Sequence, residues 1–553
     1  MTIATRGGRW SIWPLLAVFF LGLSVSAEAQ IDDEEFRAVV AEFVDANFRE
    51  KTSLAEQLLE SGHPGAPDVL TALMEGRLYI RDQDTQVFVI ESTSDDLLEF
   101  ILLDPVSRET VGSSSPDQLS RIITNNQLRR FLRTAVPRFS LSSPDNEIRL
   151  EAVRQLLRAL DDTVFDLLRQ RANQETDPRV LFEIETALAL SDLDSNNRQT
   201  RISAINLLTD RLNPEVHNRL SVILERDENG NYLETDEGVL LAATEALGSI
   251  DTARTFYSII ETAFFGLSLG SVLALAAIGL AITFGVMGVI NMAHGELIML
   301  GAYTTYVVQL LMPNNIDLSL LVAIPAGFLV AGAAGVLIER TIIRFLYGRP
   351  LETLLATFGL SLVLQQFVRS VFTANNRPVE TPSWMSGTLQ FNEVFSLTYN
   401  RLYIVILTLA VFGVLLAVLR FSRVGLDIRA VSQNRLMARA MGVRSDWVDA
   451  MTFGLGSGIA GVAGVALSQL TNVGPNLGQA YIIDSFMVVV FGGVGNIWGT
   501  LIGGMSLGII NKVIEPFAGA VLGKILVLIA VILFIQRRPR GLFPQTGRAA
   551  EGM

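Results

Sequence analysis

The chain of 553 residues contains no cysteine and only three histidines. Without cysteine it cannot form disulfide bonds, thiolate metal sites or cysteine nucleophiles, although this absence does not identify a compartment. His63 lies in a Gly-His-Pro-Gly turn and His217 lies near a polar helix start, and neither has another histidine close to it in sequence. We therefore expect both side chains to be solvated and the chain to hold no metal.

Charged residues are scarce in the second half of the chain. Residues 31–255 contain 42 acidic and 23 basic side chains, whereas residues 256–553 contain 13 acidic and 18 basic ones. Hydrophobic residues make up 50% of the chain, and the mean hydropathy is +0.40. The composition divides the chain into an acidic half and a membrane half, and the chain is too long for a single ordinary domain.

The N-terminus has the pattern of a secretory signal peptide. Two arginines precede the apolar run 12–25, and an Ala-Glu-Ala sequence that ends at Ala29 resembles a cleavage site. The run is shorter than the roughly 20 residues that span a bilayer, which favours cleavage after Ala29 over an uncleaved anchor. The expected domains are a signal peptide at 1–29, a periplasmic helical domain at 30–255, a transmembrane domain at 256–548 and a cytoplasmic tail at 549–553.

The acidic half contains helical patterns and one candidate β-hairpin. Apolar residues recur at helical spacing from Asp32 to about Leu59, and the β-rich segments 78–80 and 87–90 are separated by a polar turn. Farther on, four segments each place Ala and Leu on one stripe and end at Asp, namely 148–161, 179–192, 200–210 and 239–251. Such helices must bury their stripes against one another, so we expect a mainly α-helical domain with a HEAT-like solenoid.

The second half is expected to be an all-α, polytopic membrane domain. Apolar runs of spanning length lie at 257–286, 294–312, 319–345, 352–373, 401–420, 449–470 and 521–537. Arginines follow the third, fifth and last runs, which predicts that these ends are cytoplasmic and that the acidic half is periplasmic. The run 483–511, broken at Gly492–Asn496, is expected to enter and leave on the outer side as two half-length, re-entrant helices. The alternative is that the run 483–511 forms a pair of full spans and that the segment 294–312 is not a full span.

Asn291, His294 and Glu296 form a polar cluster within the membrane half. Ionisable groups in a bilayer are costly, so they usually face a cavity or one another. His294 and Glu296 are two positions apart and do not share a helix face, which makes a metal site or a proton relay built from this pair alone unfavourable. Helix capping and interhelical hydrogen bonding are the favoured roles.

A basic, soluble-looking island at 425–442 lies between two apolar runs and reads GLDIRAVSQNRLMARAMG. Its arginines are typical of a cytoplasmic loop. Ala430, Met437, Ala438 and Met441 are expected to line one helical face, where small side chains would let another protein come close. Gly442 is expected to end this helix. The alternative is an ordinary basic loop that only fixes the topology.

Three segments resemble the LivH-type permeases of branched-chain amino acid ABC importers. They are 266–303, which ends in NMAHGELIMLGAY, then RAVSQNRLMARAMGV at 429–443 and FGLGSGIAGVAGV at 453–465. Within that family, the tail at 492–504 and 515–548 is most similar to the UrtB-type urea permeases, and the long exported half also fits that branch.

The resemblance implies an importer built from this chain, a second permease subunit, two cytoplasmic ATPase subunits that use ATP-Mg, and a periplasmic solute-binding protein. It also implies that Arg429, Ala430, Asn434, Ala438 and Gly442 couple the permease to the ATPases. The sequence contains no GxxxxGK[ST] motif, which agrees with ATP hydrolysis in partner subunits. The chain is therefore not expected to be an enzyme, to bind a cofactor or to bind nucleic acid.

The expected function is that of a multi-pass inner-membrane permease for a small polar solute, specifically urea. Urea needs hydrogen-bonding groups along a narrow path, and the candidate lining residues are Ser268, Ser271, Asn291, Gly493 and Asn496. A branched-chain amino acid is the alternative solute, and its zwitterion would need a helix terminus or a charge near the path. A membrane-anchored periplasmic scaffold is the alternative from another class, although an anchor would not need so many spans.

Overall fold

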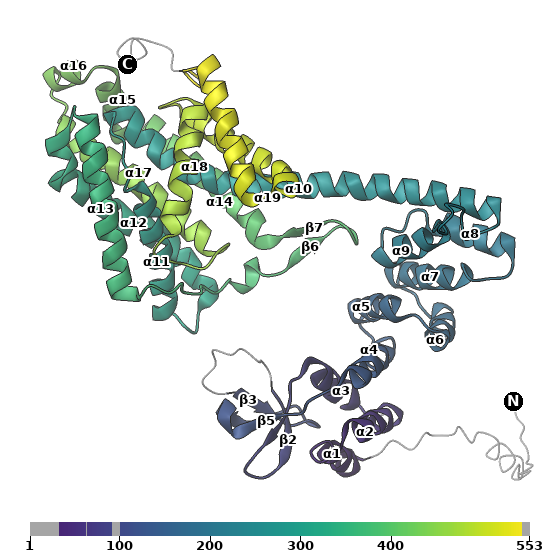
Figure 1. The fold of residues 1–553 in the computed structure, drawn as a ribbon. Helices are drawn as coiled ribbons and strands as arrows, with labels where there is room; N and C mark the ends of the chain where they lie inside the picture. Colours follow the sequence, from purple (N-terminus) through teal and green to yellow (C-terminus); the bar gives the residue numbers. More distant parts are fainter. Residues whose placement is uncertain (1–31, 62, 91–99, 545–553) are drawn as a thin grey trace, which may run out of the picture. The chain divides into compact units, whose positions relative to one another are not determined.

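The computed structural model describes residues 32–61, 63–90 and 100–544. The chain separates into two compact units, the first ending at Ile250 and the second beginning at Asp251. Both are predominantly helical, as the sequence predicted (Figure 1).

The boundary between the units falls inside one continuous helix, α10 (Glu237–Met287). This helix contains both the last predicted repeat, 239–251, and the first predicted span, 257–286. The predicted signal peptide at 1–29 and the predicted tail at 549–553 lie outside the described residues.

The first part of unit 1 combines helices with a small antiparallel sheet. Its helices are α1 (Asp33–Glu42), α2 (Phe48–Glu60), α3 (Ala66–Glu75) and α4 (Asn126–Ser140), and its strands are β1 (Leu78–Arg81), β2 (Gln86–Ile90), β3 (Phe100–Leu103), β4 (Thr110–Ser114) and β5 (Leu119–Arg121). The strand order is β4-β3-β2-β1-β5. The predicted hairpin is confirmed, since Leu78 pairs with Val89. The other strands were not expected, because β4 reads TVGSS and has no alternating apolar pattern.

The prediction that His63 is solvated is wrong. Its ring stacks on Phe36 with a centroid distance of 4.0 Å, and the side chain is 6% exposed. Its Nδ1 accepts a 3.0 Å hydrogen bond from the backbone N–H of Gly65, and its Nε2 lies 3.0 Å from Asp33 Oδ1. The turn therefore buries the ring and satisfies both of its nitrogens.

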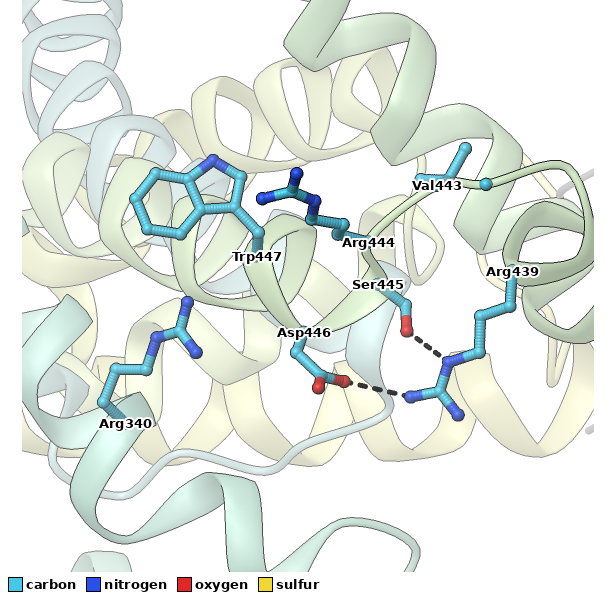
Figure 2. A pocket seen from close by; sticks show the side chains of 8 residues that line it. Arg340, Arg439, Val443, Arg444, Ser445, Asp446 and Trp447 are labelled. Atoms are coloured by element: carbon cyan, nitrogen blue, oxygen red, sulfur yellow. Dashed lines mark hydrogen bonds and ion pairs between the residues drawn. The ribbon is translucent and has the colours of Figure 1, made fainter.

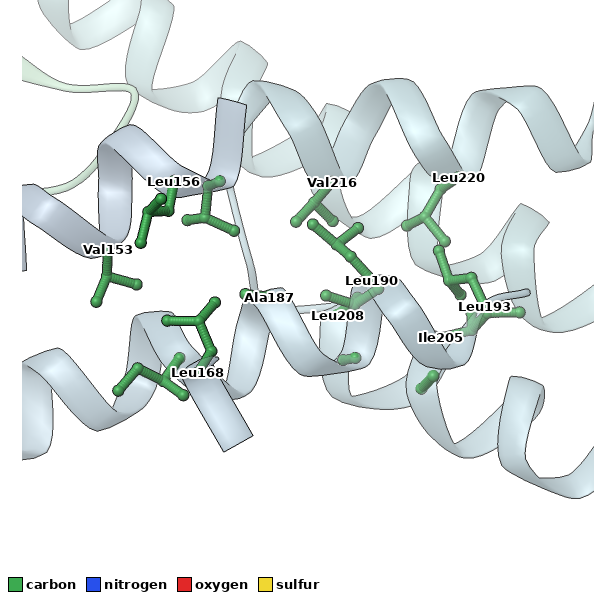
Figure 3. Close-up of a cluster of buried hydrophobic side chains, with 14 of the residues drawn as sticks. Val153, Leu156, Leu168, Ala187, Leu190, Leu193, Ile205, Leu208, Val216 and Leu220 are labelled. Carbon is green, nitrogen blue, oxygen red and sulfur yellow. The ribbon is translucent and has the colours of Figure 1, made fainter. Parts of the chain in front are cut away.

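The second part of unit 1 is a succession of helices with one shared core (Figure 3). The helices are α5 (Asn146–Leu156), α6 (Asp162–Ala172), α7 (Pro178–Asp192), α8 (Arg198–Leu208) and α9 (Pro214–Ile223), with the 3₁₀ turn η2 (Leu157–Ala159) after α5. Val153, Leu168, Ala187 and Leu208, from four different helices, are fully buried in this core. The stripes are thus buried against one another, as expected, while the HEAT-like assignment stays a prediction.

A buried ion pair joins α5 to the start of α7. The guanidinium of Arg149 donates hydrogen bonds of 2.9 and 2.8 Å to Glu175, and the two side chains are 9% and 0% exposed. Arg171 lies 3.0 Å from the same carboxylate, and the backbone N–H groups of Thr176 and Asp177 donate to it at 2.9 and 3.0 Å. The bond from Arg149, assisted by these donors, holds the pKa of Glu175 far below its usual range.

Unit 2 is a helical bundle that begins within α10. Its further elements are α11 (His294–Leu311), α12 (Ile316–Thr341), η3 (Ile343–Leu346), α13 (Pro350–Phe372), η4 (Ser383–Met385), β6 (Thr388–Gln390), β7 (Ser396–Thr398), α14 (Tyr399–Phe421), α15 (Arg423–Gln433), α16 (Arg435–Ala440), α17 (Ser445–Ser468), α18 (Leu477–Gly492) and α19 (Ile497–Arg537). Within the described part of the chain, 6 helices are long and apolar enough to cross a membrane: α10, α12, α13, α14, α17 and α19. The predicted span 294–312 is a helix, α11, but it does not belong to this set.

The predicted break at Gly492–Asn496 exists. The helix before it, α18, has 16 residues and is shorter than a span, as predicted, whereas the helix after it continues to Gly519 and is longer than predicted. Gly493 has φ +108°, and Asn496 caps the start of α19. The backbone N–H of Phe543, near the C-terminus, donates a 3.1 Å hydrogen bond to the carbonyl of Gly492. The break therefore lies beside the C-terminal segment at one end of the bundle.

Helix α19 is long because two helical segments meet at a reversal. Gly519 has φ +76° and ψ 162°, which are not helical values, and the chain then folds back so that Gly523 lies beside Glu515. Two antiparallel arms, one on each side of Gly519, replace the predicted outer re-entrant loop.

A second interruption lies at 288–293, between α10 and α11. The imidazole Nε2–H of His294, the first residue of α11, donates a 2.8 Å hydrogen bond to the carbonyl oxygen of Ala276. Ala276 lies three helical turns, or about 16 Å, before the end of α10 at Met287. Helix α11 thus begins part-way along α10, which makes this connection the broken element at depth in the bundle.

Helices α11, α12 and α17 approach one another at backbone distance. A Cβ added to Gly301 would collide with the backbone of Gly461, and one added to Gly461 would collide with the carbonyl oxygen of Gly327. Small residues at such crossings let helices pack closely within membranes. The glycines of the GIAGVAG segment in α17 therefore have a packing role.

One end of unit 2 is rich in arginine, and we call it the arginine-rich end. Arg340 lies over the Trp447 ring at 5.5 Å, and Arg435 donates a 2.5 Å hydrogen bond to the Tyr347 hydroxyl. These contacts join the end of α12, the connection to α13 and the segment 435–447. The arginines of this end are Arg340, Arg344, Arg349, Arg420, Arg423, Arg429, Arg435, Arg439, Arg444, Arg537, Arg538 and Arg540, and its acids are Glu339, Glu352, Asp427, Asp446 and Asp449.

The opposite end is held together by aromatic and amide contacts. The rings of Tyr257 and Phe395 stack at 6.0 Å, which joins α10 to the β6–β7 hairpin. The side-chain amide of Gln309 makes hydrogen bonds of 2.8 and 3.0 Å to the backbone of Glu380. The connections after α11 and α13 therefore meet at this end.

Candidate solute path and coupling surface

The predicted polar cluster lies in the interior of the bundle. Asn291, His294 and Glu296 are 0%, 0% and 2% exposed. Asn291 Oδ1 accepts a 3.0 Å hydrogen bond from the backbone N–H of Ala293, which is a local capping interaction of the favoured kind. The interruption at 288–293 thus places polar side chains where a continuous helix would have left only apolar ones.

Helix α13 supplies the other side of this cluster. Its polar residues Thr353, Thr357, Ser361 and Gln365 recur at every fourth position and are all buried, whereas Leu351 is 79% exposed. Residues four apart share one face of a helix, so α13 has a polar stripe that faces inward and an apolar face that is exposed.

Two hydrogen bonds connect the stripe to the interruption. The Thr357 hydroxyl accepts a 3.1 Å bond from the backbone N–H of Met292, and the Gln365 amide donates a 2.7 Å bond to Glu296. We call the two groups together the polar seam, made of Asn291, His294, Glu296, Thr353, Thr357, Ser361 and Gln365. Sequence reasoning missed its α13 half, although the spacing of four within an apolar run was visible.

Hydrogen-bonding capacity remains unused in the seam. Asn291 Nδ2, His294 Nδ1 and Glu296 Oε2 are buried and have no hydrogen-bond partner among the residues that the structure describes. Buried polar groups are nearly always satisfied, so these atoms are suited to water or to a polar solute. Among the described residues no group of His, Cys, Asp or Glu could hold a metal ion.

The other predicted lining residues do not join the seam. Ser268 and Ser271 lie on α10 and are fully buried, and the Ser271 hydroxyl bonds to Leu267 in its own helix at 2.8 Å. Gly493 and Asn496 lie at the break before α19, where the Asn496 amide donates a 3.2 Å bond to the carbonyl of Phe543. These contacts give Gly493 and Asn496 a structural explanation.

The basic island forms two short helices at the arginine-rich end. Asn434 separates α15 from α16 with extended backbone angles, φ −155° and ψ 99°. Its backbone N–H donates a 3.1 Å bond to Ala430, and its side chain accepts a 2.9 Å bond from the N–H of Met437. Gly442, with φ +89°, ends the second helix as expected. Asn434 therefore both ends one helix and starts the next.

The break at Asn434 overturns the predicted helix face. Ala438 is only 6% exposed and packs with Ile428, Val431 and Val448 in a small core. The exposed apolar residues are instead Leu436 (79%), Met437 (60%) and Met441 (79%). We call these three the coupling patch. The break changes the phase of the second helix, so that its larger side chains point outward and Ala438 supports them from beneath.

Ionic contacts fix the two helices to the bundle. Arg435 forms an ion pair with Asp449 of α17, and Arg439 lies 3.0 Å from Asp446. Of the predicted coupling residues, Arg429 is exposed and Ala430 is partly buried. The surface is thus apolar at its centre, basic around it and anchored on α17.

Comparison with known proteins places residues 262–535 in a family described as branched-chain amino acid transport system / permease component. The high-affinity branched-chain amino acid transport system permease protein LivH of Salmonella typhimurium is 33% identical over 302 residues, which cover 52% of this chain and 97% of LivH. The corresponding protein BraD of Pseudomonas aeruginosa is 32% identical over 301 residues, with 52% and 96% covered.

A more distant similarity extends to another import permease. The ribose import permease protein RbsC of Escherichia coli is 25% identical over 327 residues, which cover 53% of this chain and 92% of RbsC. No solved structure matches the chain.

Proposed function

Because this chain belongs to the permease family of branched-chain amino acid transport systems, we propose that it is the membrane subunit through which an ABC importer passes its solute. The chain is a multi-pass inner-membrane protein. The observation that carries the proposal is the pairing of a buried polar seam with an exposed coupling patch in one helical bundle. A membrane anchor would need neither feature, which argues against the scaffold alternative.

The coupling patch is the proposed contact with a cytoplasmic ATPase subunit. Exposed apolar side chains on a short, anchored helix are typical of a protein interface. In this proposal Leu436, Met437 and Met441 make the contact, while Asn434, Ala438 and Gly442 hold its shape. ATP-Mg is bound and hydrolysed by that partner. A second permease subunit and a periplasmic solute-binding protein complete the importer.

The proposed orientation puts the arginine-rich end in the cytoplasm. Arginine is retained on the cytoplasmic side of bacterial inner membranes, and at this end arginines outnumber acids. The opposite end, with the start of the membrane part of α10, then faces the periplasm. This agrees with export of the acidic first unit behind a signal peptide.

The proposed solute class is the branched-chain amino acids, the substrates named for LivH and BraD. An amino acid carries an ammonium group, for which the free Glu296 oxygen in the seam is a suitable acceptor. Urea is the second candidate. Its N–H groups would suit the same acceptors, and the chain differs from LivH by the long exported half that precedes the family match at residue 262.

Uptake measurements test the function and the solute together. A strain without the gene, and the same strain carrying it on a plasmid, are compared for uptake of labelled leucine and labelled urea at low concentration. We expect the plasmid to restore leucine uptake and unlabelled valine to compete with it. Restoration of urea uptake alone would favour the second candidate, and restoration of neither would contradict the assignment to this pair of solutes.

A further inference from the structure

A cavity of about 450 Å³ opens at the arginine-rich end, between the end of α12, the end of α16 and the start of α17 (Figure 2). We call it the Trp447 cavity. Arg340, Arg439, Arg444, Asp446 and Trp447 contribute to its lining. The three side chains of the coupling patch are absent from the lining. The cavity is therefore a feature separate from the proposed ATPase contact.

The charge in the Trp447 cavity is positive. Arg439 is occupied by Asp446 at 3.0 Å and by the Ser445 hydroxyl at 2.5 Å. Arg444 is exposed, and its guanidinium makes no hydrogen bond or ion pair within the described part of the chain. Figure 2 shows Arg340 and Arg444 extending beside the indole of Trp447. Arg340 lies 3.7 Å from Glu339, so Arg444 is the lining arginine that has no acidic partner among the described residues, and it makes the cavity suit an anion.

The backbone adds to this preference. Helix α17 begins at Ser445, and no side chain of the described residues caps its N-terminus. The first N–H groups of a helix have no partner in that helix, and the helix dipole makes its N-terminus positive. Asp446 opposes the positive end, but its carboxylate is bound to Arg439. The N-terminus of α17 and Arg444 therefore act in the same direction.

Exposed apolar side chains lie on α12, just after α12 and at the start of α17, and of these Trp447 lines the cavity. Leu337 on α12 is 63% exposed, Phe345 is 71% exposed and Trp447 is 56% exposed. Helices α12 and α17 are both of spanning length and composition. Tryptophan and arginine side by side at the end of spanning helices are typical of the headgroup level of a bilayer. The elements that meet at the positive cavity thus also carry exposed side chains that suit hydrocarbon.

We propose that the Trp447 cavity binds the phosphate group of an anionic phospholipid from the adjoining leaflet. Arg444 supplies the counter-charge, Arg340 lies beside it in its pair with Glu339, and Trp447 lies against the glycerol region of the lipid. The bound lipid contacts both α12 and the segment that follows α16. The lipid thereby stabilises the position of α15 and α16 relative to the rest of the bundle.

Binding of phosphatidylglycerol and phosphatidylcholine to the purified protein in neutral detergent tests this proposal. Native mass spectrometry gives the affinity for each lipid, and the midpoint of thermal unfolding gives the stabilisation. The test variant is Arg444→Gln. The matched control is Arg349→Gln, since Arg349 lies at the same end, is paired with Glu352 at 3.1 Å and does not line the cavity.

We expect phosphatidylglycerol to bind the wild type and Arg349→Gln more tightly than phosphatidylcholine does. Arg444→Gln should bind phosphatidylglycerol about five-fold more weakly, the change that corresponds to about 1 kcal/mol per arginine near an anionic membrane. Its unfolding midpoint without lipid should match that of the wild type, because Arg444 is exposed.

Three outcomes would overturn the proposal. Equal weakening in both variants would show that only overall charge matters. Stabilisation of the wild type by inorganic phosphate, to the same extent as by phosphatidylglycerol, would show that a free anion is the ligand. Loss of phosphatidylglycerol binding when the ATPase subunits are present would assign the cavity to an acidic side chain of that partner.

Discussion

Gln365 donates a 2.7 Å hydrogen bond to Glu296, and this bond joins the inward stripe of α13 to the first turn of α11. The other carboxyl oxygen of Glu296 has no hydrogen-bond partner in the described part of the chain. The pair therefore holds the two sides of the polar seam together while leaving one acceptor available. The seam is the part of the proposed path that mutation can test most directly.

The replacement Gln365→Leu should impair transport, because it removes the hydrogen-bond donor of Glu296. The carboxyl group would then be buried without a protein partner, which costs about 1–3 kcal/mol and lets the seam rearrange. Uptake per folded molecule should fall at least several-fold. The control is Gln366→Leu, because Gln366 is the next residue on the same helix and is exposed. Equal activity of the two variants would remove the seam from the path.

Replacement Met441→Glu should uncouple transport from ATP hydrolysis without loss of folded protein. Met441 is 79% exposed, so the carboxylate is solvated in the isolated chain, but it would be desolvated against an ATPase surface. Ala438→Glu should behave differently, because Ala438 is buried and the variant should lower the abundance of folded protein. Solute-stimulated ATPase activity of the assembled importer and thermal unfolding distinguish the two effects. If the solute stimulated ATPase activity normally in Met441→Glu, the proposed role of the coupling patch would be contradicted.

Acid should weaken unit 1 through Glu175. Its folded-state pKa lies far below the unfolded value of about 4.3, so the stabilisation from Arg149 is present above that pH and is lost as the pH falls below it. At pH 7, Glu175→Gln should be destabilised by about 3 kcal/mol, because it leaves Arg149 buried without its charge partner. Pulse proteolysis of the first unit in the full-length protein measures the free energy of unfolding of the wild type and of the variant at each pH. The difference in the free energy of unfolding between the variant and the wild type should become smaller below pH 4. A difference that stays constant with pH would contradict the stabilising role of the Arg149–Glu175 pair.

Replacement Gly493→Ala should destabilise the bundle more than Gly519→Ala. Both glycines have positive φ, which costs an alanine about 1–2 kcal/mol. At Gly493 the added Cβ would also lie 2.6 Å from the carbonyl oxygen of Phe543, whereas at Gly519 it would meet nothing within 4 Å. Thermal unfolding gives the comparison. Uptake per folded molecule should be equal in the two variants, and a specific transport loss in Gly493→Ala would restore this residue to the path.

Reporter fusions test the orientation. A reporter active only in the periplasm should be active when it is fused after Thr252 and silent when it is fused after Arg423. The reason is the excess of arginine at the end that holds Arg423. The opposite pattern would reverse the sidedness of both the first unit and the coupling patch.

The sequence predicted the elements that depend on local pattern. The runs that became α12, α13, α14 and α17 were recognisable from length and hydropathy, and Gly442 from its place after a helical run. Helix α19 was harder, because its two arms meet at Gly519 and the contact that locates its start comes from Phe543, far away in sequence. Patterns of hydropathy contain no information on such a contact.

The candidate site was predicted only in part, because some of its contacts join residues that are far apart in sequence. Asn291, His294 and Glu296 were conspicuous as polar residues in an apolar run, but their partner Gln365 lies on another helix. For the basic island, the sequence correctly indicated a helical segment that ends at Gly442. It could not give the face, because the turn at Asn434 changes which side chains point outward.

The backbone contacts among Gly301, Gly327 and Gly461 have a consequence for how a transport cycle can proceed. Helices whose backbones are in direct contact cannot move closer together. Separate tilting of α11, α12 and α17 would therefore open voids between them. We therefore expect these three helices to move as one rigid unit. Conformational change is then assigned to a part that lacks such contacts, namely the connection at 288–293, where Gly288 has open space beside it.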